Sequence, residues 1–490
     1  MFFLSDFSDF FGVSVAVFSL SAYLVLNITY SVSFSSFQQL SFPQINGLNS
    51  TNIVFLLLLL LASSDCGSFL EYGKQSAGNH SFYNSIFQSL LMVSITCFFF
   101  ITSNFVKSKK IVNFEYNLLI NFAIIGLLLI NSCENLLTFY LAIELQSLCF
   151  YVLACLNKNS SHCAEAALKY FILGAFSSGL LLFGFILFYA AFGSISFECF
   201  ERLDSTTSLL VSTCGCFFFS VALLFKLGSF PFHMWLCDVY EGSMLNITAF
   251  FSTVPKLILF AFFIKLNFEV FFAKKYLVST MLLFSALGSV CFASVVALYQ
   301  KRVKRLVAYS TISHTGFIIL AIGCMTVDSV KTTMIYLVLY ILMSLTLFAI
   351  LCLSSINNNK QKYIINWASF FDRNFSMAFA FAIVIFSTAG IPPLAGFYSK
   401  LCVLTCLISN GHVLIAVVVA IFSSIACFYY IRLIKILFFG SAASRNWFWL
   451  GSGTNSVESF IGISMLLIVM FLLAPNLLIN LATIAATSLV

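Results

Sequence analysis

The chain has 490 residues, of which 61% are hydrophobic and only 8% are charged. A soluble domain carries about 25% charged residues, so this composition excludes a set of water-soluble domains. Unbroken apolar runs such as 54–62 argue against a transmembrane β-barrel, whose strands alternate apolar and polar residues. We therefore expect one all-α polytopic membrane protein. The formal charge of +7 comes from scattered residues, and it does not indicate binding to nucleic acid.

Motifs for cofactors are missing from the sequence. The 16 cysteines form no CxxC pair and no Cys/His grouping with zinc or iron–sulfur spacing. Neither G-x-G-x-x-G nor a P-loop occurs, so no nucleotide site is indicated. The first ten residues hold two Asp and no Lys or Arg, and we therefore expect no cleaved presequence.

A bilayer-spanning helix needs about 20 mostly apolar residues. The chain contains fourteen such stretches, at 11–33, 52–70, 83–105, 114–132, 133–157, 165–193, 208–229, 244–264, 277–299, 306–325, 332–356, 376–407, 412–437 and 459–485. We expect three parts: N-terminal helices 1–3 in 1–110, a core of helices 4–13 in 111–440, and a loop with helix 14 in 441–490.

The basic residues predict how the helices are oriented. Loops after odd-numbered spans hold fourteen Lys and Arg residues, including the dense cluster at 301–305, and loops after even-numbered spans hold six, Lys265 among them. Because loops rich in Lys and Arg stay on the negative side, the odd loops are expected in the matrix or cytoplasm. With fourteen spans, both termini then lie on the opposite side, which in a mitochondrion is the intermembrane space.

The remaining charges fall inside the predicted spans. Four lysines do so, Lys169, Lys226, Lys256 and Lys400, together with Glu144; Glu134 lies at the edge of the same span as Glu144. Each such group costs roughly 2.5–3.5 kcal/mol at the bilayer centre, so these groups are expected to face one another or a wet cavity. For Lys169 and Glu134, a position near the membrane surface is an equal alternative.

Two of these lysines neighbour the strongest helix breakers in the chain. Lys226 precedes Gly228-Ser229-Phe230-Pro231, and Lys400 follows Gly390-Ile391-Pro392-Pro393. Proline removes a backbone donor, and broken helices at membrane depth are tolerated where they line an enclosed or wet cavity. A plain proline kink is the alternative. His314, inside the span at 306–325, suits a proton relay, whereas His233 is expected to be an interfacial loop anchor.

These residues carry a family pattern. Tyr140–Tyr151 (YLAIELQSLCFY) and Glu165–Gly179 (EAALKYFILGAFSSG) resemble the fifth and sixth helices of the chain 2 subunits of proton-translocating NADH–quinone oxidoreductase, respiratory complex I. Phe225–Gly242 and Ala389–Lys400 resemble the interrupted helices that all antiporter-like subunits of that complex share. The mitochondrial form fits best, and the motifs together cover roughly residues 130–405.

The resemblance implies two inverted five-helix repeats, two interrupted helices and a central polar axis that moves protons. Its site residues would be Glu144, Lys226, Lys256 and Lys400, with His314 and Glu134 as further relay groups. It also implies a translocase subunit of the mitochondrial inner membrane without a redox centre of its own. NAD, FMN, iron–sulfur clusters and ubiquinone would belong to partner subunits. The expected partners are other membrane-arm subunits, including neighbouring antiporter-like chains, and lipids.

Three alternatives stay open at this stage. A plastid relative of the same subunit would work with ferredoxin and plastoquinone. A stand-alone antiporter would exchange Na⁺ or K⁺ for protons through the same lysines. A purely structural membrane-arm subunit would use its buried charges to fix helix packing.

Overall fold

The computed structural model describes residues 17, 19–27, 80–109, 115–157, 160–194, 196–197, 209–271, 274–357, 362–368, 374–440 and 455–489. Nearly all of these residues are helical, and in these ranges the only extended pairings are two isolated β-bridges. The expected all-α fold is therefore confirmed. A helix satisfies its own backbone N–H and C=O groups, which hydrocarbon cannot do.

Ten helices in the described ranges are long and apolar enough to cross a bilayer. They are α3 (His80–Ser108), α4 (Glu115–Ser132), α5 (Leu136–Ala154), α6 (Ser161–Phe192), α7 (Leu209–Leu227), α9 (Leu245–Glu269), α10 (Lys275–Leu298), α11 (Val303–Gly323), α12 (Val327–Asn357) and α16 (Val413–Phe439). They correspond to the expected spans 3 to 11 and 13. The expected span 52–70 lies outside the described residues, and of span 11–33 the described residues 17 and 19–27 are helical.

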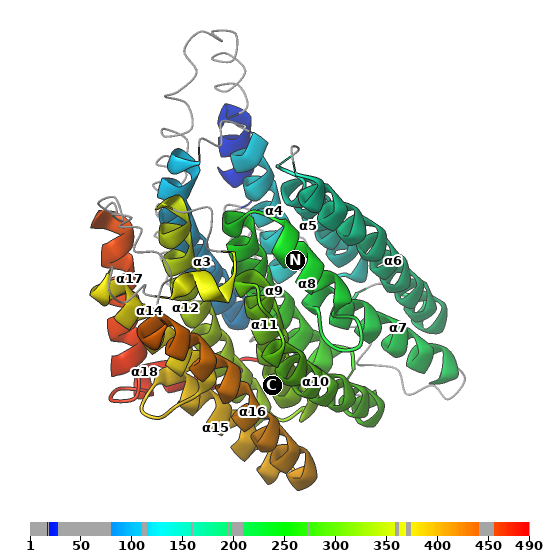
Figure 1. Cartoon of the computed structure of the whole chain (residues 1–490). Coiled ribbons are helices and arrows are strands. Elements are labelled where there is room, and N and C mark those ends of the chain that lie inside the picture. The colour runs from blue at the N-terminus through cyan, green and yellow to red at the C-terminus, as the bar shows by residue number, and fades with distance from the viewer. Residues whose placement is uncertain are drawn as a thin grey trace. The chain divides into compact units, whose positions relative to one another are not determined.

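The two expected interruptions are present. After α7 the chain leaves the helix at 228–233 and then forms the short helix α8 (Met234–Gly242). The predicted span 376–407 divides into α14 (Phe375–Ala389) and α15 (Ala395–Ser409), which Figure 1 shows as separate segments.

A third interruption was not expected. The last predicted span, 459–485, consists of α17 (Asn455–Met470) and α18 (Asn476–Thr487) instead of one continuous helix. Pro475 precedes α18, and proline both lacks a backbone N–H and disfavours helical backbone in the residue before it. The prediction of a continuous span was therefore wrong, for a reason that Pro475 already indicated.

The chain folds as two compact units. The first unit joins Met1–Leu223, Val254–Lys274 and Thr487–Val490, and the second joins Leu224–Thr253 and Lys275–Ala486. The three-part division of the sequence into 1–110, 111–440 and 441–490 stays a prediction.

In the first unit, α4 packs on α3 and α5, and α5 packs on α6. Aromatic side chains fill much of this interior: Phe139 stacks on Phe262 with ring centroids 3.7 Å apart, and its ring lies 5.7 Å from that of Phe219. This packing explains the abundance of phenylalanine, because a Phe ring buries a large apolar area without a polar atom that needs a partner.

In the second unit, α11 is buried along its whole length and packs against α8, α10, α12 and α15. Figure 1 shows α10 and α11 lying side by side. The two backbones approach closely, since a methyl group on Gly316 would overlap the side chain of Ser289. Small residues at a helix interface allow such an approach in membranes.

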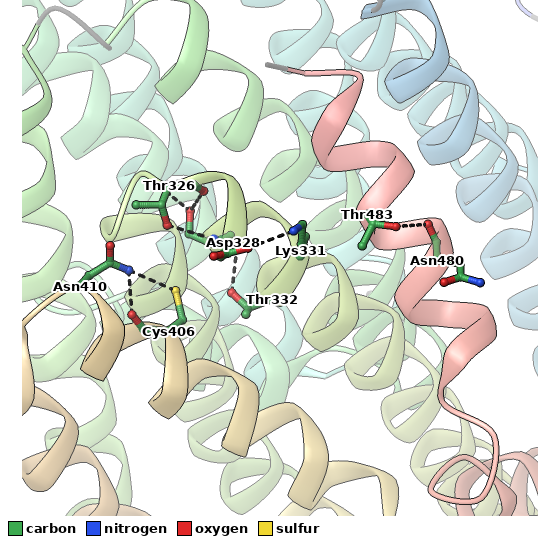
Figure 2. A network of polar contacts seen from close by, with 9 residues as sticks. Thr326, Asp328, Lys331, Thr332, Cys406, Asn410, Asn480 and Thr483 are labelled. Atoms are coloured by element: carbon green, nitrogen blue, oxygen red, sulfur yellow. Dashed lines mark hydrogen bonds and ion pairs between the residues drawn. The ribbon is translucent and has the colours of Figure 1, made fainter.

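In the second unit, loops that follow odd-numbered spans contact one another, and so do loops that follow even-numbered spans. In the second unit, the start of α11 contacts α8, and Val303 N donates to the Lys362 carbonyl at 3.1 Å; these segments follow odd-numbered spans. Thr326 and Ser329 cap the start of α12 reciprocally, and Figure 2 shows Thr326 beside Asn410 at the end of α15. Those two turns follow even-numbered spans. A chain that crosses a bilayer repeatedly must place its odd-numbered and even-numbered loops on opposite sides, which is the arrangement seen here.

Candidate functional site

The six predicted site residues divide between the two units. Glu134, Glu144 and Lys256 belong to the first unit, and Lys226, His314 and Lys400 belong to the second. The Glu144–Lys226 pair implied by the sequence would join residues of different units, and it stays a prediction. Within the second unit, the structure brings His314 and Lys400 into one network.

Lys400 lies beside the break between α14 and α15. Helix α14 ends at Gly390, whose φ of +83° is left-handed, and the last carbonyl groups of such a helix have no intrahelical donor. The Lys400 ammonium takes this role: Nζ donates to the Thr388 carbonyl at 3.0 Å and to the Ala389 carbonyl at 2.6 Å. It also lies 5.6 Å from the ring centroid of Phe317, a cation–π distance. A positive charge is thus held at membrane depth by backbone dipoles and an aromatic face.

Lys226 occupies the last turn of α7, just before the other break. Here Gly228 has φ +72°, and neutral groups satisfy the end of the helix. Ser229 donates to the Leu224 carbonyl through its N–H at 3.1 Å and its hydroxyl at 3.0 Å. The indole Nε1 of Trp235 donates to the Phe225 carbonyl at 3.0 Å. Neutral donors therefore bind the Leu224 and Phe225 carbonyl groups, next to the half-buried Lys226 side chain.

Lys256 follows a proline inside a continuous helix. Pro255 lies within α9 and removes one helical hydrogen bond in the turn before it. Lys256 is 4% exposed, and the most apolar part of α9 is completely buried. All three site lysines thus lie near a proline. The Pro255-Lys256 pair was a signal that the sequence analysis did not use.

His314 lies in the buried interior of α11 and is 4% exposed. Its Nδ1 is 2.8 Å from the hydroxyl of Tyr336 on α12. The Tyr336 ring stacks on Phe317 with centroids 5.9 Å apart, and Phe317 is the aromatic neighbour of Lys400. One tyrosine and one phenylalanine therefore separate His314 from Lys400.

Glu144 lies on a half-buried face of α5. The hydroxyl of Ser147 donates to its backbone carbonyl at 3.0 Å and is 3.4 Å from its carboxylate oxygen Oε2. Leu141 and Leu148, one turn away on either side, are each more than half exposed. Glu134 is exposed in the junction before α5, where its carbonyl accepts the Phe197 N–H at 3.1 Å. Its role as a relay stays a prediction.

Lys169 forms an ion pair on the surface of α6. Its Nζ lies 2.8 Å from the Glu165 carboxylate one turn earlier, and both side chains are largely exposed. This placement agrees with the position near the membrane surface that we considered for Lys169.

Two sequence assignments were wrong. Lys265, counted as a residue of an even-numbered loop, lies in α9 and is 5% exposed; it donates to the Cys133 carbonyl at 3.3 Å and pairs with Glu269 at 3.9 Å. Its i,i+4 spacing from Glu269 was a usable signal that the helix continues. His233, expected as an interfacial anchor, is 1% exposed, with its ring centroid 4.5 Å from that of Phe292.

The sequence analysis also missed a group of buried tyrosines near His314. Tyr336 and Tyr340 of α12 and Tyr429 and Tyr430 of α16 are each at most 3% exposed. Their spacing, one turn apart on α12 and adjacent on α16, was visible in the sequence. A tyrosine hydroxyl group is uncharged, so the pattern of charged residues did not point to these tyrosines.

Comparisons with known proteins agree with this geometry. A family model described as NADH:quinone oxidoreductase/Mrp antiporter, TM, matches residues 133–426. The chain is 33% identical over 480 residues to NADH-ubiquinone oxidoreductase chain 2 of Marchantia polymorpha, which covers 96% of each chain. It is 35% identical over 387 residues to NADH-quinone oxidoreductase subunit N 1 of Acidiphilium cryptum, covering 79% of this chain and 80% of that one.

A solved structure gives the same fold. A chain of respiratory complex I from Thermus thermophilus with bound aureothin superposes with a TM-score of 0.76 at 24% identity, covering 96% of this chain and 99% of that one. The helix order, the interrupted helices and the buried lysines thus define a polytopic, antiporter-like membrane protein. The chain belongs to the NADH:quinone oxidoreductase/Mrp antiporter family and, within it, groups with chain 2 of NADH-ubiquinone oxidoreductase. The resemblance inferred from the motifs is confirmed, and the protein is a multi-pass inner-membrane protein.

Proposed function

We propose that this chain moves protons across the inner mitochondrial membrane as a core membrane-arm subunit of NADH:ubiquinone oxidoreductase. The protons would travel along Glu144, Lys226, Lys256, His314 and Lys400, with Glu134 as an entry or exit group. Electron transfer from NADH to quinone in partner subunits would drive them. The relatives named above, which are NADH–quinone oxidoreductase subunits, support this assignment.

One observation carries the proposal at the level of chemistry. The Lys400 ammonium is held by the two carbonyl groups of a broken helix, at 3.0 and 2.6 Å, and the rings of Phe317 and Tyr336 lie between it and His314. A lysine that only filled space at this depth would be a costly substitute for leucine or methionine. A protonatable group whose ligands are weak neutral dipoles can instead exchange its proton when the ligands move.

The transfer steps follow from the order of the groups. With the Lys226 ammonium paired to the Glu144 carboxylate, the proton is retained, since each charge stabilises the other. When the pair opens, Lys226 gives its proton to a neutral Lys256 through water. Lys256 passes it through His314 to a neutral Lys400, which releases it on the opposite side of the membrane.

Coupling to electron transfer would begin outside this chain. NAD, FMN, iron–sulfur clusters and ubiquinone would be bound by partner subunits, and a partner would alter charge or hydration at one end of the axis. Neighbouring antiporter-like chains and lipids would cover its exposed apolar helix faces. The excess of Lys and Arg in odd-numbered loops would keep those loops in the matrix and both termini in the intermembrane space.

The test uses the assembled complex in sealed vesicles. Glu144→Gln and Lys226→Ala should each lower the number of protons moved per NADH oxidised. Lys331→Ala is the matched control, because Lys331 pairs with Asp328 at 3.0 Å at the start of α12 and its carboxylate partner is exposed. If both site variants pump and oxidise NADH at the rate of the control, the assignment of these residues is wrong.

A second measurement separates the pump subunit from a stand-alone antiporter. The isolated chain in vesicles should exchange neither Na⁺ nor K⁺ for protons, since the proposed driving force comes from its partners. Cation exchange by the isolated chain that Lys226→Ala abolishes would favour the antiporter instead.

A further inference from the structure

Four buried tyrosines gather between α12 and α16 in the second unit. We refer to Tyr336, Tyr340, Tyr429 and Tyr430 as the tyrosine cluster; their exposed fractions are 0, 2, 1 and 3%. Tyr430 interacts electrostatically with both Tyr336 and Tyr340, and its ring centroid lies 4.3 Å from that of Tyr429. A hydroxyl group buried at this depth is costly unless another polar group satisfies it.

Phenylalanine would fill this volume without that cost. The chain contains 61 Phe and 19 Tyr, so Phe is its usual choice for a large aromatic side chain. Four hydroxyl groups at one place are therefore unexpected for packing alone. What each hydroxyl contacts then decides between a structural role and a functional one.

Two of the four hydroxyl groups have direct hydrogen-bond partners. The Tyr340 hydroxyl donates to the Ser252 carbonyl at 2.9 Å, a contact that fixes two helices. The Tyr336 hydroxyl lies 2.8 Å from His314 Nδ1. The first contact ends at a backbone oxygen, which cannot pass a proton on, whereas the second ends at a titratable ring.

The other two hydroxyl groups lack direct partners in the described part of the chain. The Oη atoms of Tyr429 and Tyr430 are buried and make no regular hydrogen bond there. Tyr430 nevertheless lies within interaction range of the Ser310 and Thr388 side chains, Tyr429 lies within range of Ser313, and the two tyrosine hydroxyl groups interact with each other.

The hydroxyl groups of the neighbouring serine and threonine side chains can accept hydrogen bonds. Ser310, Ser313 and Thr388 each donate their own proton to a carbonyl three residues earlier, at 2.7, 2.7 and 2.9 Å. Their oxygen lone pairs therefore remain available to a tyrosine or to water. A water molecule bridges such a site when it finds two to four polar partners, and five hydroxyl groups meet here.

The cluster reaches both predicted relay groups. At one end, Tyr336 contacts His314. At the other end, Tyr430 interacts with Thr388, whose backbone carbonyl accepts the Lys400 ammonium at 3.0 Å; because a backbone oxygen cannot pass a proton on, water must complete this end of the path. Helices α11, α12, α14, α15 and α16 supply these groups, and α14 packs on both α15 and α16.

We propose that Tyr336 and Tyr430, with Tyr429 and bridging water, carry protons between His314 and Lys400. This inference rests on the proposed function and adds the groups that make its last step. The Nδ1–H of protonated His314 passes to the Tyr336 oxygen while the Tyr336 hydroxyl proton moves on to water. Water and Tyr430 repeat the exchange, and the final proton binds a neutral Lys400 amine. Each O–H bond that breaks is replaced, so no tyrosine keeps a charge.

The experiment compares Tyr430→Phe with Tyr83→Phe in the assembled complex. Tyr83 is a matched control, because it is 2% exposed and its hydroxyl donates to the Ala261 carbonyl at 2.9 Å in the first unit. The loss of proton transport in Lys400→Ala is the reference with which the tyrosine variants are compared. In vesicles, we expect Tyr430→Phe to remove at least half of the proton transport per NADH that Lys400→Ala removes, and Tyr83→Phe to remove none.

A stability measurement separates the relay from a structural role. Tyr83→Phe loses a direct hydrogen bond to a backbone carbonyl, whereas Tyr430→Phe loses only water-mediated or weaker contacts, so Tyr430→Phe should lower the melting temperature of the complex no more than Tyr83→Phe does. A purely structural tyrosine cannot lower pumping more than Tyr83→Phe does while lowering the melting temperature no more. Tyr336→Phe should reduce pumping as well.

The outcomes distinguish the two proposals. If Lys400→Ala lowers pumping but Tyr430→Phe and Tyr336→Phe match the Tyr83→Phe control, the relay is wrong and the proposed function stands. If Lys400→Ala also pumps like the control, the proposed function and the relay both fail.

Discussion

The two broken helices look alike in sequence, but their ends are capped by different chemistry. Each combines a left-handed glycine, Gly228 or Gly390, with proline and a nearby lysine. At the first break, Ser229 and Trp235 donate to the carbonyl groups of Leu224 and Phe225 in the last turn of α7. At the second break, the Lys400 ammonium donates to the last two carbonyl groups of α14. The charge of Lys400 is therefore part of the fold of the second break, whereas neutral donors bind the end of α7.

The protonation state of Lys400 should affect the stability of the second break. A lysine that caps a helix stabilises the break most strongly while it is protonated, because an ammonium donates more strongly than a neutral amine. Loss of the proton would weaken the hold between α14 and α15. At the second break, the protonation of Lys400 is therefore coupled to the backbone geometry between α14 and α15.

Gly396→Ala should have the largest effect. A methyl group there would overlap the Ser387 backbone carbonyl, which cannot turn aside as a side chain can. We expect destabilisation of about 3 kcal/mol or more and little assembled complex on a native gel. At the first break, Gly228→Ala meets the flexible Leu236 side chain, so it should cost only the left-handed backbone penalty, about 1–2 kcal/mol. Equal yields of the two variants would contradict the inference that the backbone is packed more tightly at the second break than at the first.

Lys400→Met should destabilise the complex more than Lys226→Met does. It leaves the Thr388 carbonyl without its Lys400 donor, at about 1–3 kcal/mol, and leaves the Ala389 carbonyl with only the weak Cys427 thiol donor. Melting temperature measures this difference, and proton transport should fall in both variants. Lys400→Arg keeps a permanently charged donor, so it should retain stability but not transport. An equal loss of stability in the two Met variants would disprove the capping role of Lys400.

Trp235→Phe tests the neutral cap of the first break. The Phe ring keeps the stacking on Phe225, whose plane is 18° from that of the indole, and removes the donor to the Phe225 carbonyl. We expect a loss of about 1–3 kcal/mol and retained proton transport per NADH. A selective loss of transport, with the melting temperature unchanged, would show that this cap does more than stabilise the helix end.

Arg305→Gln should have the smallest effect. Arg305 joins α11 to α8 through Asp238 and Glu241, at 3.4 Å each, and its side chain is 40% exposed. Exposed ion pairs contribute about 0–1 kcal/mol and weaken in salt. Urea or thermal denaturation in low and high salt should reveal a small difference that vanishes at high ionic strength. A loss as large as that of Trp235→Phe would mean that α8 is held mainly by charge.

Much of the fold followed from local patterns. Apolar length predicted the helices from α3 to α16, and Gly-Pro clusters predicted the breaks after Lys226 and before Lys400. Pro475 was read as part of a span because the apolar run continues past it, although its missing N–H interrupts the helix. Lys265 was placed in a loop because charge was treated as the end of a span, while the structure buries it beside Glu269.

The candidate site was predictable as a set of charges but not as a network. Composition and helix length by themselves determined that this protein is a membrane bundle and that a few lysines lie at membrane depth, since both properties depend on residues within one segment. Tertiary structure alone decided that Lys400 caps α14, that Tyr336 contacts His314 and that Tyr430 interacts with Thr388. These contacts join helices far apart in the chain, and no local pattern specifies which side chains meet when such helices pack.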